Sequence, residues 1–141
     1  MSIEDDKAVA AAVVERVMDQ GDLAAIDDYY AAGYIEHDVL PPSIPSGREG
    51  MRQLMAVFRA AFPDLHYAVD DVVADGDKVV LRVMGSGTMH GPLFGLAATG
   101  RSASWSEIHI SRFAGGKVVE HWSVTDQLGM LQQLGLSADA R

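Results

Sequence analysis

The residues of this chain that could move protons gather near its C-terminal end. The segment from Lys117 to Asp126 reads as a strand, in which alternate side chains share one face. That face carries Glu120, Trp122 and Asp126 among valines, which is unlike a plain hydrophobic core. Burial generally raises the pKa of a carboxylate and suits it to act as a general base. We therefore predict Asp126 as an acid/base residue at the floor of a pocket.

Asp126 also has a structural interpretation. A short amphipathic helix is predicted to begin directly after it, and aspartate is a favoured N-cap residue. Thr125 could fill that position instead, so the cap interpretation is not forced. The residues alone leave both roles open.

A second group of candidates lies on the predicted strand from 102 to 113. Trp105, Glu107 and His109 alternate onto one face of it. If this strand pairs with the next through the turn at 114–117, both faces could line one cavity. His109 could then orient Asp126 or polarise a substrate carbonyl, as imidazole does in other enolising enzymes. The alternative is a histidine that is hydrogen-bonded within the sheet.

Further side chains are candidates for substrate binding. Trp105 and Trp122 could enclose a flat ring, although large aromatic residues are more often core residues. Arg82 could anchor a carboxylate or enolate, or could pair with Glu107 or Glu120. His37 could enter the mouth of the cavity or cap a helix carbonyl.

Histidine spacing gives no indication of a metal site. His121 alternates away from Asp126, which predicts an outward-facing, structural residue. The five histidines form neither an HxH nor an HxxxH pattern, and there is no cysteine. We therefore expect neither a metal nor another cofactor.

Composition narrows the class of protein. The 141 residues suit a single domain, 1–141, with a real hydrophobic core. The formal charge of -9 argues against nucleic acid and anionic membranes as partners. No segment reaches the run of about 18 apolar residues that a membrane span needs. The acidic N-terminus does not resemble a signal peptide, so we expect a cytoplasmic protein.

Periodicity divides the chain into a helical first half and a stranded second half. Ser2 and Asp5 predict a helix start, Asp22 a second helix up to Tyr30, and Ser46 with Glu49 a capping box. The strands are predicted at 65–74, 79–88, 102–113 and 117–126. This pattern predicts an α+β domain, in which a curved antiparallel sheet wraps over about three helices and leaves a central pocket.

Several motifs along the chain resemble those of the SnoaL-like polyketide cyclases. They span roughly Tyr34 to Gly135 and come in the family's order: Glu36-His37-Asp38, Gly47-Arg48-Glu49-Gly50, Phe58 to Asp64, Asp75-Gly76-Asp77, Gly85 to Gly91, Phe94-Gly95, Thr99-Gly100-Arg101, Glu120-His121-Trp122, Asp126 and Leu131 to Gly135. The resemblance implies the cone-shaped fold of nuclear transport factor 2, usually as a homodimer.

The resemblance also implies an activity. The best-understood members close a polyketide ring by intramolecular aldol condensation without a metal or Schiff base, and their acid/base aspartate matches Asp126. One motif departs from the family. Members often read Gly-Thr-His-x-Gly, whereas this chain reads Gly87-Thr88-Met89-His90-Gly91. His90 is therefore a further candidate for substrate binding, but its shifted place would put it on the other face of a strand.

We therefore expect a cofactor-independent aldol-type cyclase that acts on a small hydrophobic, polyketide-like or ester-bearing molecule through Asp126. The alternatives are another proton-transfer enzyme (isomerase, dehydratase or epoxide hydrolase) and a non-catalytic small-molecule-binding module. Epoxide hydrolysis would need a second carboxylate and an arginine near the acid. A binding module would show Asp126 as an exposed cap and a pocket without convergent polar groups.

Overall fold

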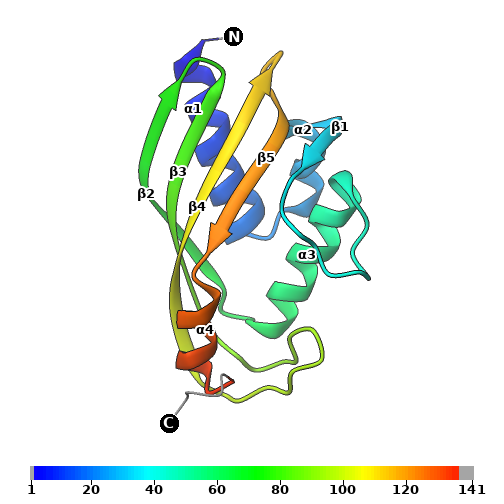
Figure 1. Cartoon of the computed structure of the whole chain (residues 1–141), viewed down its shortest axis with the longest axis vertical. Coiled ribbons are helices and arrows are strands. Elements are labelled where there is room, and N and C mark those ends of the chain that lie inside the picture. Colours follow the sequence, from blue (N-terminus) through cyan, green and yellow to red (C-terminus); the bar gives the residue numbers. More distant parts are fainter. Residues whose placement is uncertain (1, 137–141) are drawn as a thin grey trace.

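The computed structural model describes residues 2–136, which form one curved five-stranded sheet with helices packed against it (Figure 1). The strand order across the sheet is β1-β5-β4-β3-β2. All neighbouring strands are antiparallel except β1 and β5, which are parallel. The strands are β1 (Tyr30–Glu36), β2 (His66–Asp75), β3 (Lys78–Thr88), β4 (Ser102–Ala114) and β5 (Lys117–Thr125).

The first helix begins as predicted. Ser2 and Asp5 form a capping box at the start of α1 (Ile3–Ala12), each side chain accepting a hydrogen bond from the other residue's backbone N–H. The helix continues as a π-helical segment, η1 (Val13–Asp19). Gly21 then reverses the chain with a φ of +75°, a conformation that glycine adopts without a steric penalty.

The remaining helical elements are short except for α3. They are the 3-10 segment η2 (Leu23–Ala25), α2 (Ile26–Tyr29), α3 (Gly47–Ala61) and α4 (Gln127–Leu134). Ser46 precedes α3, but its side chain makes no capping hydrogen bond, so the predicted capping box is absent. Glu49 contacts Arg52 in the next turn of the helix instead. Gly135 ends α4 in the left-handed conformation, as its position predicted.

Strand β1 was not predicted. The second helix ends at Tyr29, and the chain continues from Tyr30 as a strand that lies beside β5. Glu36 pairs with His121 at the end of this ladder, and the His37 N–H donates to the His121 carbonyl at 2.9 Å. Pairing with the distant strand β5 therefore determines the conformation of this segment, whose own sequence pattern did not predict a strand.

A bulge in β5 changes which side chains face the helices. Phe113 pairs with Val118 and Arg112 pairs with Glu120, so Val119 is an extra residue in β5. Beyond the bulge the inward-facing side chains are those of His121 and Ser123. An unbroken strand would instead have placed Glu120 and Trp122 beside Val118 on the inner face.

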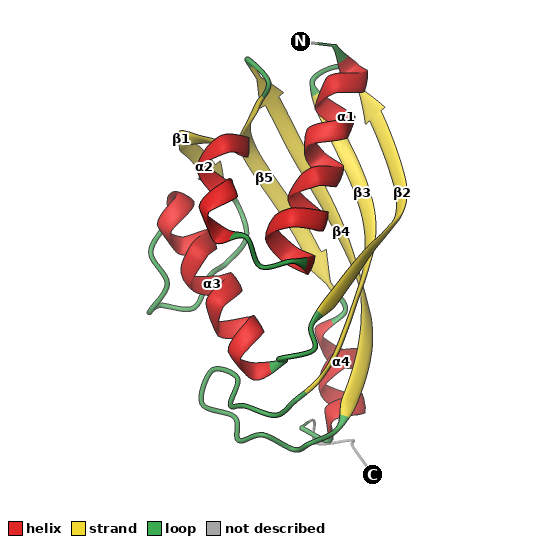
Figure 2. Cartoon of the chain, turned by 180° about the vertical axis from the view of Figure 1, so that it is seen from behind, coloured by secondary structure: helices red, strands yellow, loops and turns green. Residues whose placement is uncertain are grey.

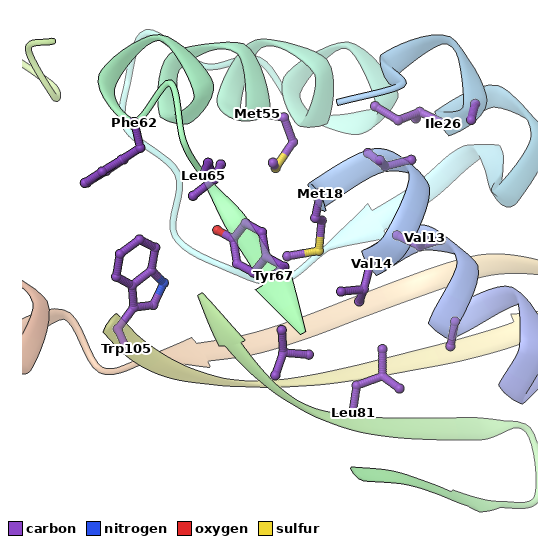
Figure 3. Close-up of a cluster of buried hydrophobic side chains, with 14 of the residues drawn as sticks. Val13, Val14, Met18, Ile26, Met55, Phe62, Leu65, Tyr67, Leu81 and Trp105 are labelled. Atoms are coloured by element: carbon purple, nitrogen blue, oxygen red, sulfur yellow. The ribbon is translucent and has the colours of Figure 1, made fainter. Parts of the chain in front are cut away.

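The helices α1, α2 and α3 cover one face of the sheet (Figure 2). Buried side chains from α1, η1, α3 and the strands meet between these layers (Figure 3), among them Val13, Val14, Met18, Met55, Phe62, Tyr67, Leu81 and Trp105. Trp105 packs directly over Gly85. A β-carbon at residue 85 would lie 2.6 Å from the indole nitrogen, which explains the glycine.

None of the helices in residues 2–136 is both long and apolar enough to cross a bilayer.

Candidate active site

The predicted central pocket is present between the sheet and the helices. It has a volume of about 770 Å³ and is lined mainly by apolar side chains from α1, η1, α3, α4 and the loops around residues 40 and 95. The polar side chains gather on the wall made by β1, β4 and β5. On this wall or directly after β1 lie Glu36, Asp38, Glu107, His109, Ser111, His121, Ser123 and Thr125. An apolar cavity with a few convergent polar groups is typical of a small-molecule site.

Four of these side chains form a continuous row across three strands. Glu36 Oε2 lies 2.7 Å from Nδ1 of His121, and Nε2 of His121 lies 2.9 Å from Nδ1 of His109. Nε2 of His109 then lies 2.7 Å from Oε1 of Glu107. Each of the four side chains is only 7% to 14% exposed. We refer to Glu36, His121, His109 and Glu107 as the Glu–His–His–Glu row.

Aromatic residues support both ends of this row. The Trp105 indole N–H donates to Oε2 of Glu107 at 2.7 Å. Burial, followed by the negative charge of Glu107, raises the pKa of Tyr67 well above its usual range. At the other end the Tyr34 hydroxyl lies 3.4 Å from Glu36, and burial followed by the Glu36 charge raises the Tyr34 pKa. Both phenols are therefore neutral hydrogen-bond donors at neutral pH.

Asp38 forms a second acidic position beside the row. Its Oδ1 accepts the Ser123 backbone N–H at 2.6 Å, and its Oδ2 accepts the Ser123 hydroxyl. Ser123 lies opposite His109 in the pairing of β4 with β5. Asp38, two residues after the end of β1, is thus attached to the centre of the polar wall of the cavity.

The cavity contains more negative than positive side chains. Glu36, Asp38 and Glu107 line it, whereas no lysine or arginine is among the lining residues of the described chain. Glu36, Asp38 and His121 also bring one ligand atom each within 4.8 Å of one another, a set that could hold a metal ion. Both nitrogens of His121 already have hydrogen-bond partners, which offers a protein-only account of the same cluster.

Asp126 lies outside the cavity, contrary to the expectation from strand alternation. It is exposed, and its Oδ1 accepts the backbone N–H of Gly129 at 3.0 Å as the N-cap of α4. The bulge at Val119 and the end of β5 at Thr125 explain its position. Asp126 therefore occupies the N-cap position that was its alternative interpretation. The cavity nevertheless contains convergent polar groups, which a plain binding module would lack.

Of the other predicted residues, His109 and Glu107 line the cavity and Trp105 supports it. His37 and Trp122 do not line it. Their rings stack with centroids 4.6 Å apart, and His37 contacts Glu120 at 2.7 Å. The bulge at Val119 turns Trp122 and Glu120 to the other face of the sheet, where His37 contacts both of them.

Arg82 and His90 are also placed outside the cavity. Arg82 is exposed and contacts Asp71 at 2.6 Å and Asp70 at 3.4 Å, so its partners are not the predicted Glu107 or Glu120. His90 is exposed, whereas Met89 is fully buried. The shifted histidine of this motif therefore does not reach the site.

Sequence reasoning missed Glu36, Asp38, His121 and Ser123. The Glu36-His37-Asp38 motif was visible, but its residues could not be joined to β5 without knowledge of the parallel strand pair. His121 was assigned to the outer face because alternation cannot reveal a bulge. That prediction was wrong, because His121 is only 7% exposed and is hydrogen-bonded within the cavity wall.

Comparison with known proteins identifies the family of this chain. Residues 8–134 match the family described as SnoaL-like polyketide cyclase. The chain is 30% identical over 131 residues to aklanonic acid methyl ester cyclase DauD from Streptomyces sp. (strain C5), covering 87% of this chain and 80% of that protein. It is 29% identical over 112 residues to nogalonic acid methyl ester cyclase from Streptomyces nogalater, covering 78% and 83%.

A similar structure is that of TsrD from Streptomyces laurentii, with a TM-score of 0.81 at 30% identity and 96% coverage of both chains. The predicted nuclear transport factor 2-like α+β fold is thereby confirmed. On the match of residues 8–134 and the identity to known cyclases, this chain belongs to the SnoaL-like polyketide cyclases.

Proposed function

We propose that the protein is a cofactor-independent cyclase that closes a ring by intramolecular aldol condensation, with His109 as its acid/base residue. The observation that carries this proposal is the position of His109 on the polar wall of a large apolar cavity, between two hydrogen-bonded partners. The names of two relatives point to polyketide methyl esters as substrates. A cavity of about 770 Å³ falls in the usual range for small-molecule sites.

The chemistry needs one base and one acid in succession. A carbon flanked by carbonyl groups loses a proton, and the resulting enolate attacks a ketone of the same molecule. The C–C bond forms as the ketone π bond breaks, and the alkoxide takes up a proton. Since one proton leaves and one returns, a single imidazole can serve both steps without a net change.

Asp38 is the aspartate that lines the cavity, and it is the alternative acid/base residue. Both of its carboxylate oxygens already accept hydrogen bonds from Ser123. His109 has partners at both of its ring nitrogens as well, so both residues stay candidates for the base. Epoxide hydrolysis is less well supported, because Arg82 pairs with surface acids and no arginine lines the described cavity.

The test is turnover of a polyketide β-keto methyl ester, followed by chromatography for a product of unchanged mass and one more ring. We expect His109→Gln to lower kcat by about 100-fold or more, the usual contribution of a general acid/base. His66→Gln is a matched control, because His66 is an exposed histidine on β2 that contacts Asp19. Tight binding of such esters without ring closure would reject the cyclase in favour of the binding module.

We also propose that the protein is a homodimer through the uncovered face of the sheet. Ile108 and Val124 are exposed there and face each other in the pairing of β4 with β5, and Met84 is exposed on β3. Exposed apolar patches of this kind often mark protein interfaces. Light scattering should give twice the chain mass, and Val124→Lys should yield a monomer.

A further inference from the structure

Among residues 2–136, Phe94 is the one residue other than glycine with a positive φ, which is +45°. It lies in the loop between β3 and β4, which runs past the end of α3 (Figure 2). Leu93 and Leu96 close a tight turn around it, each backbone N–H donating to the other residue's carbonyl at 2.9 Å. Phe94 and Gly95 are the two central residues, and Gly95 has a φ of +84°. A turn with two positive φ angles favours asparagine, aspartate or glycine at both positions.

Phenylalanine at this position is unfavourable for the fold. In the left-handed conformation the β-carbon of an L-residue crowds the following carbonyl oxygen, a strain that glycine avoids. Burial of the ring offsets this strain only in part, because the side chain is 44% exposed. Strained backbone conformations cluster at active sites and at ligand contacts. The strain at Phe94 therefore points to a role for its side chain outside the folding of the chain.

The Phe94 ring lines the cavity and is partly exposed, so it lies at the entrance. It meets the ring of Phe58 from α3 edge to face, with centroids 6.1 Å apart and planes at 74°, and Phe58 also lines the cavity. Phe58 stacks on Phe62 at 6.4 Å, and Phe62 packs against Trp105 at 5.4 Å. A continuous series of aromatic rings thus connects the entrance with the indole that donates to Glu107.

We propose that Phe94 is a specificity-determining residue that, together with Phe58, contacts a planar aromatic ring of the substrate. This proposal rests on the proposed function, because it concerns the part of the ring-closing substrate that does not react. The reacting carbonyl groups lie against the polar wall of β1, β4 and β5, and the planar part lies against the two phenyl rings at the entrance. Aromatic pairs gain an edge-to-face or offset-stacked contact beyond their burial, which a saturated ring of similar size does not provide.

Two methyl esters that cannot close a ring test this contact without turnover. Methyl 2-naphthoate is planar, and methyl decahydro-2-naphthoate is its saturated counterpart. In isothermal titration calorimetry the wild type should bind the planar ester about tenfold more tightly than the saturated one. Phe94→Leu keeps an apolar side chain but removes the ring, so it should reduce this preference by about threefold or more.

Val73→Leu is the control for that substitution. Val73 is an apolar residue of β2 that is 60% exposed and does not line the cavity. The preference for the planar ester should be the same in this variant as in the wild type. The proposal would be overturned by a wild type without the preference, by an unchanged preference in Phe94→Leu, or by an equal reduction in both variants.

Thermal unfolding tests the strain at Phe94 separately. Phe94→Gly and Phe94→Ala both remove the ring, but only glycine adopts the left-handed conformation without strain. We therefore expect a higher thermal midpoint for Phe94→Gly than for Phe94→Ala, the reverse of the usual order for these two residues. A midpoint of Phe94→Ala at or above that of Phe94→Gly would remove the argument that the ring is kept for binding. Since neither measurement needs turnover, the absence of ring closure together with an intact planar preference would reject the cyclase and not the role of Phe94.

Discussion

The Asp126 carboxylate accepts the backbone N–H of Gly129 at 3.0 Å and thereby caps the last helix outside the cavity. Asparagine is an equally good N-cap residue, so Asp126→Asn should keep both activity and stability. Asp126→Ala should lose about 1 kcal/mol of unfolding free energy through the lost cap, with kcat within about twofold of the wild type. Urea unfolding and the ring-closure assay measure the two effects.

Asp126→Asn and His109→Gln together distinguish the two candidate acid/base residues. A fall in kcat of about 100-fold in Asp126→Asn, in a protein of unchanged stability, would restore Asp126 as the acid/base residue.

Gly85 allows Trp105 to reach Glu107. A β-carbon at residue 85 would lie 2.6 Å from the Trp105 indole nitrogen and 2.8 Å from the Tyr67 ring, and both rings are buried. We expect Gly85→Ala to cost about 1–3 kcal/mol of unfolding free energy and to lower kcat, because the indole N–H also donates to Glu107.

Gly33→Ala is the control for that substitution. A β-carbon there meets no atom within 4 Å, and Gly33 does not have a positive φ. Its thermal midpoint should be equal to or above that of the wild type. Similar losses of stability in both variants would show that β-strand glycines matter here for their backbone and not for the space beside Trp105.

Asp64 should contribute to the loss of folding stability at acidic pH. Its carboxylate accepts the Thr88 backbone N–H at 2.7 Å and the Thr88 hydroxyl at 2.9 Å, and these two bonds lower the Asp64 pKa below its ordinary value of 3.8. A lowered folded-state pKa means that the stabilisation is complete above 3.8 and is lost as the pH falls through the folded value.

Asp64→Asn should therefore be less stable than the wild type at neutral pH, and the difference should shrink below about pH 3.8. Urea midpoints over a pH series measure it. Asp75→Asn serves as the control, because Asp75 is exposed at the end of β2. A difference that stays constant with pH would mean that Asp64 acts through geometry alone.

Chelation tests the metal alternative at Glu36, Asp38 and His121. We expect dialysis against EDTA to leave the ring-closure rate unchanged, because hydrogen bonds already engage both nitrogens of His121. Loss of activity on chelation, with recovery on addition of one divalent metal, would instead identify these three residues as ligands of a catalytic ion.

Local patterns were sufficient for most of the fold. The capping box of Ser2, the glycine turns between paired strands and Gly135 after α4 each follow from short-range chemistry, and the structure agrees with them. The α+β class and the pocket followed from the order of these elements. The family resemblance added the cone-shaped fold.

The site was harder to predict because long-range pairing assembles it. Glu36 contacts His121, and Asp38 contacts Ser123, only because β1 pairs in parallel with β5. No local sequence pattern predicted this pairing. The bulge at Val119 then exchanged the inward-facing and outward-facing side chains of the following part of β5, which carries His121 and Ser123. His109 lies on the cavity side of β4, because the alternation of this strand has no irregularity before that residue.

The pairing of β1 with β5 also sets an order of events in folding. Glu36 and His121 are 85 residues apart, so nearly the whole chain must leave the ribosome before they can meet. Contacts of such high sequence separation are costly in loop entropy and form slowly. The β2–β3 and β4–β5 hairpins can form earlier, and until β1 docks the cavity lacks the side chains of Glu36 and Asp38. Appearance of activity during refolding should therefore report on the docking of β1.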